Sequence, residues 1–414
     1  MTELAAVSGE RAAGIVLESA FAAAGGVAAL FGGYLLALAV AATRHRRGGD
    51  CGTQPATRVV VLVPAHDEAA LIERCVRSLR AQAYPSGLFD VVVIADNCRD
   101  DTAAVAARAG ARVLVRDAPG APGKGRALRW AMDAVLAEDP PPGAIAVVDA
   151  DAVAAPDFLA RLVAPLEAGA LAVQGESLLS EDGSPRTALR AAAFLLVNRV
   201  RPAGRAALGL PAALTGNGML LSRELLLAMP WEAYTSTEDL EYTLQLRLAG
   251  VGVAFAGGAV LLSPAAPNAR AAALQQLRWE GGQAHLARAW LPRLLAGALR
   301  ERRPALLDAA LDLAVPPLGL LAAGVLAGTA AAVALVPAGA LPAAVLAPWA
   351  LALVAIPLYV LVGLRAAHAP ASAYRALGRA PLFVVSKALA APRLRRFSAD
   401  TWVRTERAGG GGAR

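Results

Sequence analysis

The 414-residue chain has few of the residue types from which disulfide frameworks and metal centres are usually built. Its three cysteines are odd in number and have no CxxC spacing, so we expect free thiols in a reducing cytoplasm. Its four histidines are scattered, which argues against a histidine metal site. Charge is also scarce: Asp, Glu, Lys and Arg make up 18% of the chain, against roughly 25% in soluble domains.

The chain also lacks a basic stripe interleaved with aromatic residues, so nucleic acid is not an expected partner. No repeat of fixed period is visible. The net charge of +7 comes with arginines that flank long uncharged runs, where anionic lipid headgroups attract them. The mean hydropathy of +0.49 and the 57% hydrophobic content point in the same direction.

Two uncharged runs are long enough to cross a membrane. Residues 19–43 fit one crossing, and residues 313–364 fit two crossings that fold back at "VPAGALP" (336–342), because a span needs about 20 apolar residues. Basic residues at 44–47, 300–303, 365 and 393–396 place the flanks of all three spans in the cytoplasm by the positive-inside rule. A cleaved signal peptide is the competing interpretation of residues 1–43, but this segment has no basic amino-terminal region.

The segment between the two runs alternates apolar strands with helices. Strand patterns begin near 58, 90, 111 and 143, and each is followed by a polar turn or a helix. This alternation predicts an α/β fold with a mostly parallel sheet covered by helices on both faces. In such sheets ligands bind at the carboxyl ends of the strands, and that is where Glu68, Asp96, Asp149 and Asp151 fall.

Asp149 and Asp151 are separated by one residue at a strand end. If the strand continues, both carboxylates lie on one face and converge, and a hard divalent cation such as Mg²⁺ or Mn²⁺ would relieve their repulsion. A solvated turn explains the same pair, because aspartate is common in turns. The position of Asp96 at the end of a neighbouring strand favours the metal-site interpretation.

Three further motifs carry candidate chemistry. Lys124, in "GAPGKGRAL", lies between glycines at a predicted helix start, which suits an anion or is simply a loop. "QQLRW" (275–279) offers a phosphate-binding arginine and a stacking tryptophan, or else belongs to an amphipathic helix near the membrane. "TSTEDLEY" (235–242) is either a helix start capped by Ser236 or Thr237, or the site of a carboxylate that accepts a proton.

Together these segments resemble the family 2 glycosyltransferases, in particular the membrane-integrated branch that carries a QxxRW motif. That branch includes the synthases of cellulose, chitin and hyaluronan and ceramide glucosyltransferase. The resemblance is carried in order by "VPAHDEA" (63–69), "IADNCRDDT" (94–102), "DAD" (149–151), "TED" (237–239), "QQLRW" (275–279) and "WVRTER" (402–407). "ADNCRDDT" departs from the commoner form of its motif, and three crossings are few for a channel that extrudes a polymer.

The resemblance implies a GT-A-like fold and a role for each matching residue. Pro64, Ala65, Glu68, Asp96, Lys124 and Asp149 would bind a nucleotide sugar, and Asp151 with Asp149 would hold Mg²⁺ or Mn²⁺. Asp239 would act as general base with Glu238 beside it, whereas Glu241 is expected to be a solvated helix residue. Gln275, Arg278 and Trp279 would contact the diphosphate or the acceptor.

The resulting expectation is a multi-pass protein of the inner (plasma) membrane that transfers a sugar from a nucleotide sugar to a lipid or glycan, with inversion. Its expected segments are an extracytoplasmic start (1–18), spans at 19–43, 313–335 and 342–364, a cytoplasmic catalytic domain (48–260), interfacial helices (261–312) and a cytoplasmic tail (365–414). A nucleotidyltransferase of similar fold and a non-catalytic membrane scaffold that binds a nucleotide sugar are the alternatives. Whether a channel or export partner exists is left open.

Overall fold

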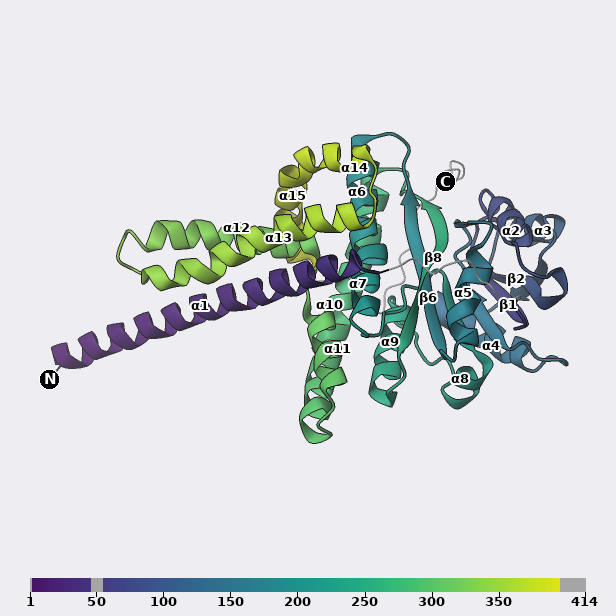
Figure 1. Ribbon diagram of the computed structural model, residues 1–414, viewed down its shortest axis with the longest axis horizontal. Coiled ribbons are helices and arrows are strands. Elements are labelled where there is room, and N and C mark those ends of the chain that lie inside the picture. The colour runs from purple at the N-terminus through teal and green to yellow at the C-terminus, as the bar shows by residue number, and fades with distance from the viewer. Residues whose placement is uncertain (1, 46–54, 395–414) are drawn as a thin grey trace.

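The computed structural model describes residues 2–45 and 55–394 (Figure 1). The "WVRTER" segment, the last part of the expected tail (395–414) and Cys51 lie outside the described residues. The described chain forms a sheet domain on one side and a group of long apolar helices on the other, with a layer of helices between them (Figure 1).

The sheet has eight strands in the order β3-β2-β1-β4-β7-β6-β8-β5. The first four of these pair in parallel, whereas β7 runs antiparallel to both β4 and β6, and β5 runs antiparallel to β8. The sheet is therefore parallel in one half and mixed in the other. The strands are β1 (Val59–Ala65), β2 (Phe89–Asp96), β3 (Arg112–Arg116), β4 (Ala144–Val147), β5 (Val153–Ala154), β6 (Ala172–Ser180), β7 (Met219–Ser222) and β8 (Val253–Pro264).

Both faces of the sheet are covered, as the continuous apolar strand patterns predict. On β1, Val59, Val61 and Val63 pack in one core, and Val60 and Leu62 pack in the other, because successive side chains alternate between faces. The first core includes α2 (Ile72–Arg80), α3 (Thr102–Arg108) and α5 (Phe158–Glu167). The second includes α4 (Lys124–Leu136), α8 (Arg223–Ala228) and α9 (Glu238–Ala249).

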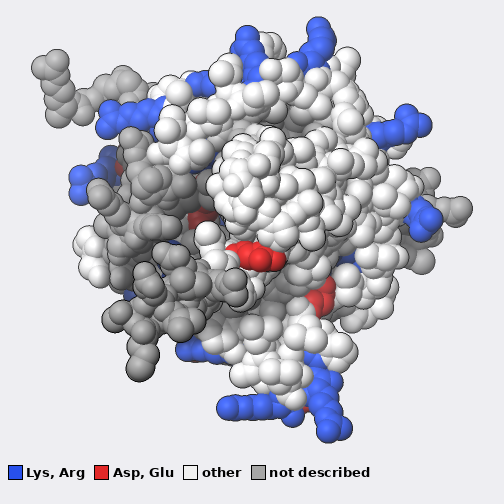
Figure 2. Space-filling view, turned by 90° about the vertical axis from the view of Figure 1, so that its left-hand side faces the viewer, with Lys and Arg blue, Asp and Glu red and all other residues white. Residues whose placement is uncertain are grey.

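Three helices are long and apolar enough to cross a membrane: α1 (Thr2–Ala42) over Gly14–Ala42, α12 (Leu318–Leu335), and η3 (Ala343–Val345) with α13 (Leu346–Ala366). α12 begins at Leu318 rather than at the expected residue 313, because Pro316 and Pro317 interrupt the helix after α11 (Pro304–Ala314). The three helices project together from the sheet domain (Figure 1). Seen from that end, most of the described surface is uncharged, with an acidic side chain near its centre and Lys and Arg around its margin (Figure 2).

A layer of helices joins the sheet to the apolar helices (Figure 1). It contains α6 (Pro185–Leu195), a π-helical turn η2 (Leu196–Val200), α7 (Arg201–Ala207), α10 (Ala269–Arg300), α11, α14 (Ala371–Ala376), η4 (Leu377–Arg379) and α15 (Ala380–Leu394). α7 lies directly against α1, where Gly204 is required because a Cβ there would come within 2.1 Å of the Leu38 carbonyl oxygen. α6, η2 and α7 follow one another without a break, so residues 185–207 are continuously helical.

Ion pairs within this layer, together with a hydrogen bond from Tyr34, connect it to the first apolar helix. The fully buried Arg205 contacts Asp308 and Asp312 on α11, and Arg201 donates to Asp312 Oδ1 at 2.7 Å. Tyr34 on α1 donates to the same carboxylate at 2.9 Å. Burial alone would raise the pKa of Asp312, but Arg201 and Arg205 hold that pKa at about 2, so Asp312 stays charged.

Candidate active site

Lys124 brings three carboxylates together at the carboxyl ends of the strands. It is the first residue of α4, and its Nζ donates to Asp149 Oδ1 and to the Gly216 carbonyl oxygen, each at 2.7 Å. The same Nζ lies 3.7 Å from Glu238 Oε1. A Cβ added to Gly216 would lie 3.0 Å from Asp239 Oδ2, so Asp239 also borders this cluster. Asp149 of "DAD" and the acids of "TED" therefore meet in space.

The electrostatics of this cluster are set by burial and by the single lysine. Burial raises the pKa of Glu238 to about 7, although Lys124 pulls it down. Burial also raises the pKa of Asp239 above the ordinary range of aspartate, again against the effect of Lys124. Burial alone would lower the pKa of Lys124, but Asp149 and Glu238 raise it, so the ammonium stays protonated. Asp239 is thus a carboxylate with increased proton affinity, as a general base requires.

The start of α9 differs from the expected helix cap. Thr237 is the N-cap residue, but the hydroxyls of Ser236 and Thr237 are buried and have no hydrogen-bond partner among the described residues. Glu241 anchors the loop instead, because its Oε2 accepts hydrogen bonds from the backbone N–H groups of Tyr234 and Thr235 at 3.0 Å. The expectation that Glu241 is merely solvated is therefore wrong: it fixes the loop that carries Glu238 and Asp239.

Asp149 and Asp151 lie in a turn rather than on a strand, because β4 ends at Val147. Strand periodicity therefore does not place their two carboxylates on one face. Asp149 is held by its own N–H, which donates to Asn217 Oδ1 at 3.0 Å, and Asp151 is buried. Two carboxylates in a polar turn, beside two more around Lys124, are a donor set that suits Mg²⁺ or Mn²⁺.

The other predicted nucleotide-binding residues follow β1 and β2. Pro64 and Ala65 are the last residues of β1, and Glu68 is buried beyond them, with its backbone N–H donating to Thr102 Oγ1 at 2.8 Å. Asp96 ends β2 and is buried in an ion pair with Arg116 at 2.5 Å. Arg116 is a neighbour that the sequence argument did not single out.

The "QQLRW" residues lie on α10 and face α6. Arg190 Nη2 on α6 donates to Gln275 Oε1 at 3.0 Å, and the rings of Phe194 and Trp279 are 5.7 Å apart. The Nε atom of Arg278 is buried without a hydrogen-bond partner in the described part of the chain. These contacts place all three α10 residues on one wall of a cleft.

Every predicted site residue lines this one cleft, which has a volume of about 2160 Å³. One end is formed by the carboxyl ends of β1 and β2 and by the cluster around Lys124. The cleft continues between α6 and α10 to the apolar helices, where its lining includes Leu318, Ala322, Ile356, Val360, Phe383 and Val384. A single space thus joins polar strand ends to the apolar helices.

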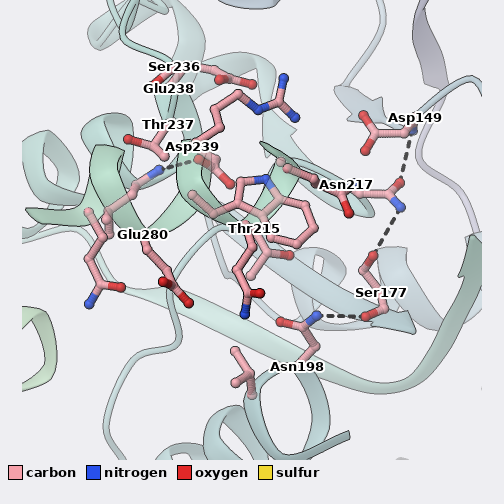
Figure 3. Close-up of a pocket in the computed structure, with 18 of the residues that line it drawn as sticks. Asp149, Ser177, Asn198, Thr215, Asn217, Ser236, Thr237, Glu238, Asp239 and Glu280 are labelled. Carbon is pink, nitrogen blue, oxygen red and sulfur yellow. Dashed lines mark hydrogen bonds between the residues drawn. The ribbon is translucent and has the colours of Figure 1, made fainter. Parts of the chain in front are cut away.

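A set of uncharged polar residues in the cleft was not predicted from the sequence (Figure 3). Asn217 Nδ2 donates to Ser177 Oγ at 3.0 Å, and Asn198 Nδ2 donates to the Ser177 carbonyl oxygen at 2.8 Å. In Figure 3 these residues and Asp149 lie across the view from Glu238 and Asp239. The available signal was "TGNG" (215–218): its two glycines have φ of +74°, which turns Asn217 into the cleft.

Comparison with known proteins finds sugar-transferring enzymes by family model, by sequence and by structure. The family model described as "Glycosyltransferase like family 2" matches residues 55–282. The chain is 30% identical over 230 residues to the beta-monoglucosyldiacylglycerol synthase of Trichormus variabilis, covering 54% of this chain and 48% of that protein. The corresponding synthase of Synechocystis is 30% identical over 209 residues, which cover 48% of this chain and 42% of that protein. The chain therefore spans about half the length of the curated relatives it matches.

Among solved structures, a mannosyltransferase from Pyrobaculum calidifontis in complex with GDP-Man and Mn²⁺ is similar with a TM-score of 0.52. It is 20% identical, and the match covers 83% of this chain and 98% of that one. This similarity confirms the expected GT-A-like fold.

Proposed function

The chain is a member of the glycosyltransferase-like family 2, and from this premise we propose that it transfers a sugar, with inversion, from a UDP-sugar to a membrane lipid or lipid-linked glycan. Two observations support a lipid acceptor: the name of the relatives contains a lipid, diacylglycerol, and the cleft continues to the apolar helices. The three apolar helices support a multi-pass location in the inner (plasma) membrane, and the basic flanks support a cytoplasmic catalytic domain.

We assign the divalent cation to Asp151 and Asp149. These carboxylates suit a hard cation, and the similar mannosyltransferase is described with Mn²⁺. When bound, such an ion neutralises charge on the diphosphate of the leaving nucleotide. Asp149 is kept in position by Lys124 and by the Asn217 side chain.

Asp239 is the proposed general base. Its raised pKa increases its affinity for the proton of an acceptor hydroxyl, and its position at the start of α9 is fixed by the loop that Glu241 anchors. Lys124 supplies positive charge as the nucleotide diphosphate departs, whereas Arg278, on α10, is assigned to the acceptor side of the cleft. Glu238 lies beside Lys124 and is assigned to positioning the lysine and the acceptor. As Asp239 takes the hydroxyl proton, the acceptor oxygen bonds to the anomeric carbon on the face opposite the diphosphate, the bond between that carbon and the diphosphate oxygen breaks, and the configuration inverts.

The observation that carries the proposal is the continuity of the cleft from the Lys124 cluster to the apolar helices. A water-soluble acceptor does not need an apolar extension lined by α12, α13 and α15. A lipid acceptor needs one, because its chains must stay in an apolar environment while its polar end reaches Asp239. The alternatives explain less: neither a nucleotidyltransferase nor a scaffold accounts for the acids at α9 and for this extension together.

The test is transfer of labelled sugar by the purified protein in phosphatidylcholine nanodiscs that contain diacylglycerol. UDP-sugars and GDP-sugars are offered separately, with Mn²⁺ or with a chelator. We expect metal-dependent label in the lipid extract from a UDP-sugar, with inverted anomeric configuration by NMR. Diphosphate release from a nucleoside triphosphate would instead identify a nucleotidyltransferase, and nucleotide-sugar binding without any transfer would identify a scaffold.

A further inference from the structure

The two ends of the cleft carry opposite charge. At the strand ends, one cation, Lys124, is surrounded by the carboxylates of Asp149, Glu238 and Asp239. At the other end, between α6, α10 and α15, the cleft lining includes three cations, Arg190, Arg278 and Lys387, and one carboxylate, Glu280, which is paired with Lys387. The first arrangement attracts a metal ion, whereas the second attracts an anion.

Two of these three cations have no carboxylate partner among the described residues. Lys387 is paired with Glu280, with 2.5 Å between Nζ and Oε1, and both side chains are largely buried. Arg190 makes no ion pair with any described residue and donates instead to the neutral side chain of Gln275. Arg278 likewise forms no ion pair among the residues described, and its Nε is buried without a partner. Leaving two guanidinium groups half-buried and uncompensated is costly unless a ligand supplies the negative charge.

The surroundings of this basic group identify the kind of ligand. Lys387 packs its stem against Gly319 at the start of α12 and lies over the ring of Phe383, with Nζ 5.7 Å from the ring centre. The apolar cleft lining of α12, α13 and α15 is adjacent. The group thus lies where the polar and apolar parts of the cleft meet. A molecule that fills both parts has an anionic head and hydrocarbon chains.

We propose that Arg190, together with Arg278 and Lys387, binds the phosphate group of a phosphate-bearing lipid whose hydroxyl is glycosylated at Asp239. This inference rests on the proposed function and adds that a lipid acceptor with a phosphate is preferred to a neutral one such as diacylglycerol. The guanidinium of Arg190 donates to the phosphate oxygens in the forked geometry that phosphate favours. Burial and the nearby Arg186 lower the pKa of Arg190, which is consistent with a site that has not yet been neutralised.

The first test measures binding without turnover. Short-chain phosphatidic acid, which has a phosphate, and short-chain diacylglycerol, which has none, are titrated into the detergent-purified protein by calorimetry. Arg190→Gln should weaken binding of phosphatidic acid by about tenfold or more, since hydrogen bonds to charged groups are strong. Its binding of diacylglycerol and of UDP with Mn²⁺ should stay within about twofold of wild type, a range that corresponds to well under 1.4 kcal/mol.

Two matched variants separate the site from general charge and from misfolding. Arg270→Gln removes an exposed arginine from the same helix as Arg278, outside the cleft lining, and should leave phosphatidic acid binding unchanged. Arg190→Lys keeps the charge but loses the forked pair of donors, so its affinity for phosphatidic acid should lie between those of wild type and Arg190→Gln. Equal affinity of wild type for the two lipids would overturn the proposal, and so would an Arg190→Gln variant that loses UDP affinity instead.

The second test uses transfer and depends on the proposed function. In phosphatidylcholine nanodiscs, phosphatidylglycerol offers both a phosphate and hydroxyls, and diacylglycerol offers a hydroxyl alone. We expect wild type to prefer phosphatidylglycerol and Arg190→Gln to lose that preference, by a rise in KM for the lipid with little change in kcat. Transfer to neither lipid would count against the proposed function, whereas the calorimetric result would still decide whether the phosphate site exists.

Discussion

At the scale of single residues, Lys124 organises the site because it compensates a cluster of acids that burial would otherwise protonate. Its ammonium touches Asp149, lies within 3.7 Å of Glu238 and lowers the pKa of Asp239. The proposed base is therefore active over a pH range that Lys124 sets. Without a nearby cation, the same carboxylate would remain protonated to higher pH.

This gives a prediction on pH dependence. Lys124→Met should move the acid limb of the kcat–pH profile to higher pH by about one unit or more, because Asp239 must lose its proton to act and removal of the cation raises its pKa. Lys124→Arg keeps the charge and should leave the limb near its wild-type position. The profile is measured at saturating UDP-sugar and metal. An unchanged limb in Lys124→Met would show that Lys124 does not control the base.

At the scale of elements, α10 packs against the loop before α9, which leads to the proposed base Asp239. Gly282 lies against the loop before α9: a Cβ there would come within 2.5 Å of Thr237 Cγ2 and 3.2 Å of Ser236 Oγ. The helix that carries Gln275, Arg278 and Trp279 thus also holds the turn that carries Glu238 and Asp239. The two halves of the site are coupled through this contact.

We therefore expect Gly282→Ala to impair catalysis more than folding. The added methyl must push Thr237 aside, at a cost of roughly 1–3 kcal/mol, and so displaces Asp239. A fall in kcat of about tenfold or more, with UDP binding retained, is the expected result. Gly33→Ala on α1, which has no described atom within 4 Å of the added carbon, is the matched control and should be neutral. Equal kcat in both variants would mean that the contact does not matter.

The sequence predicted some of these elements and site residues but not others. Strand–helix alternation was enough to predict the parallel half of the sheet, because each of those strands is a continuous apolar run between polar turns. The mixed half was not predicted, because β5 has only two residues and the antiparallel partners of β7 lie far from it in the sequence, where local patterns give no pairing. The residues at Asp149, Lys124 and Asp239 were found from short motifs. Asn198, Asn217 and Arg190 were missed because they come from separate elements that only the tertiary fold brings together.

At the scale of the whole molecule, the sheet domain and the apolar helices form a continuous unit. Arg205 and Asp312 lie where α7, α11 and α1 meet, and the cleft extends across the same boundary. The proposed lipid acceptor thus keeps its chains in the apolar part of the cleft while its polar end reaches Asp239. This arrangement requires the domain to lie against one membrane face, which we propose is the cytoplasmic one.

Cysteine labelling tests this orientation. In a background lacking the three native cysteines, Ala338→Cys lies in the exposed turn between α12 and α13, and Ser86→Cys lies on the exposed surface of the sheet domain. On intact cells, a membrane-impermeant maleimide should modify position 338 and leave position 86 unmodified until the cells are opened. The reverse pattern would contradict the cytoplasmic placement.

The most direct test of the account is the Asp239→Asn variant in lipid nanodiscs, assayed for sugar transfer and for UDP binding with Mn²⁺. Loss of the base should lower kcat by about a hundredfold to ten-thousandfold while UDP affinity stays near wild type. Asp133→Asn, an exposed aspartate on α4 outside the cleft, should retain full activity. Full transfer activity in Asp239→Asn would contradict the account, because the amide of asparagine cannot accept the hydroxyl proton and Asp239 would then not be the general base.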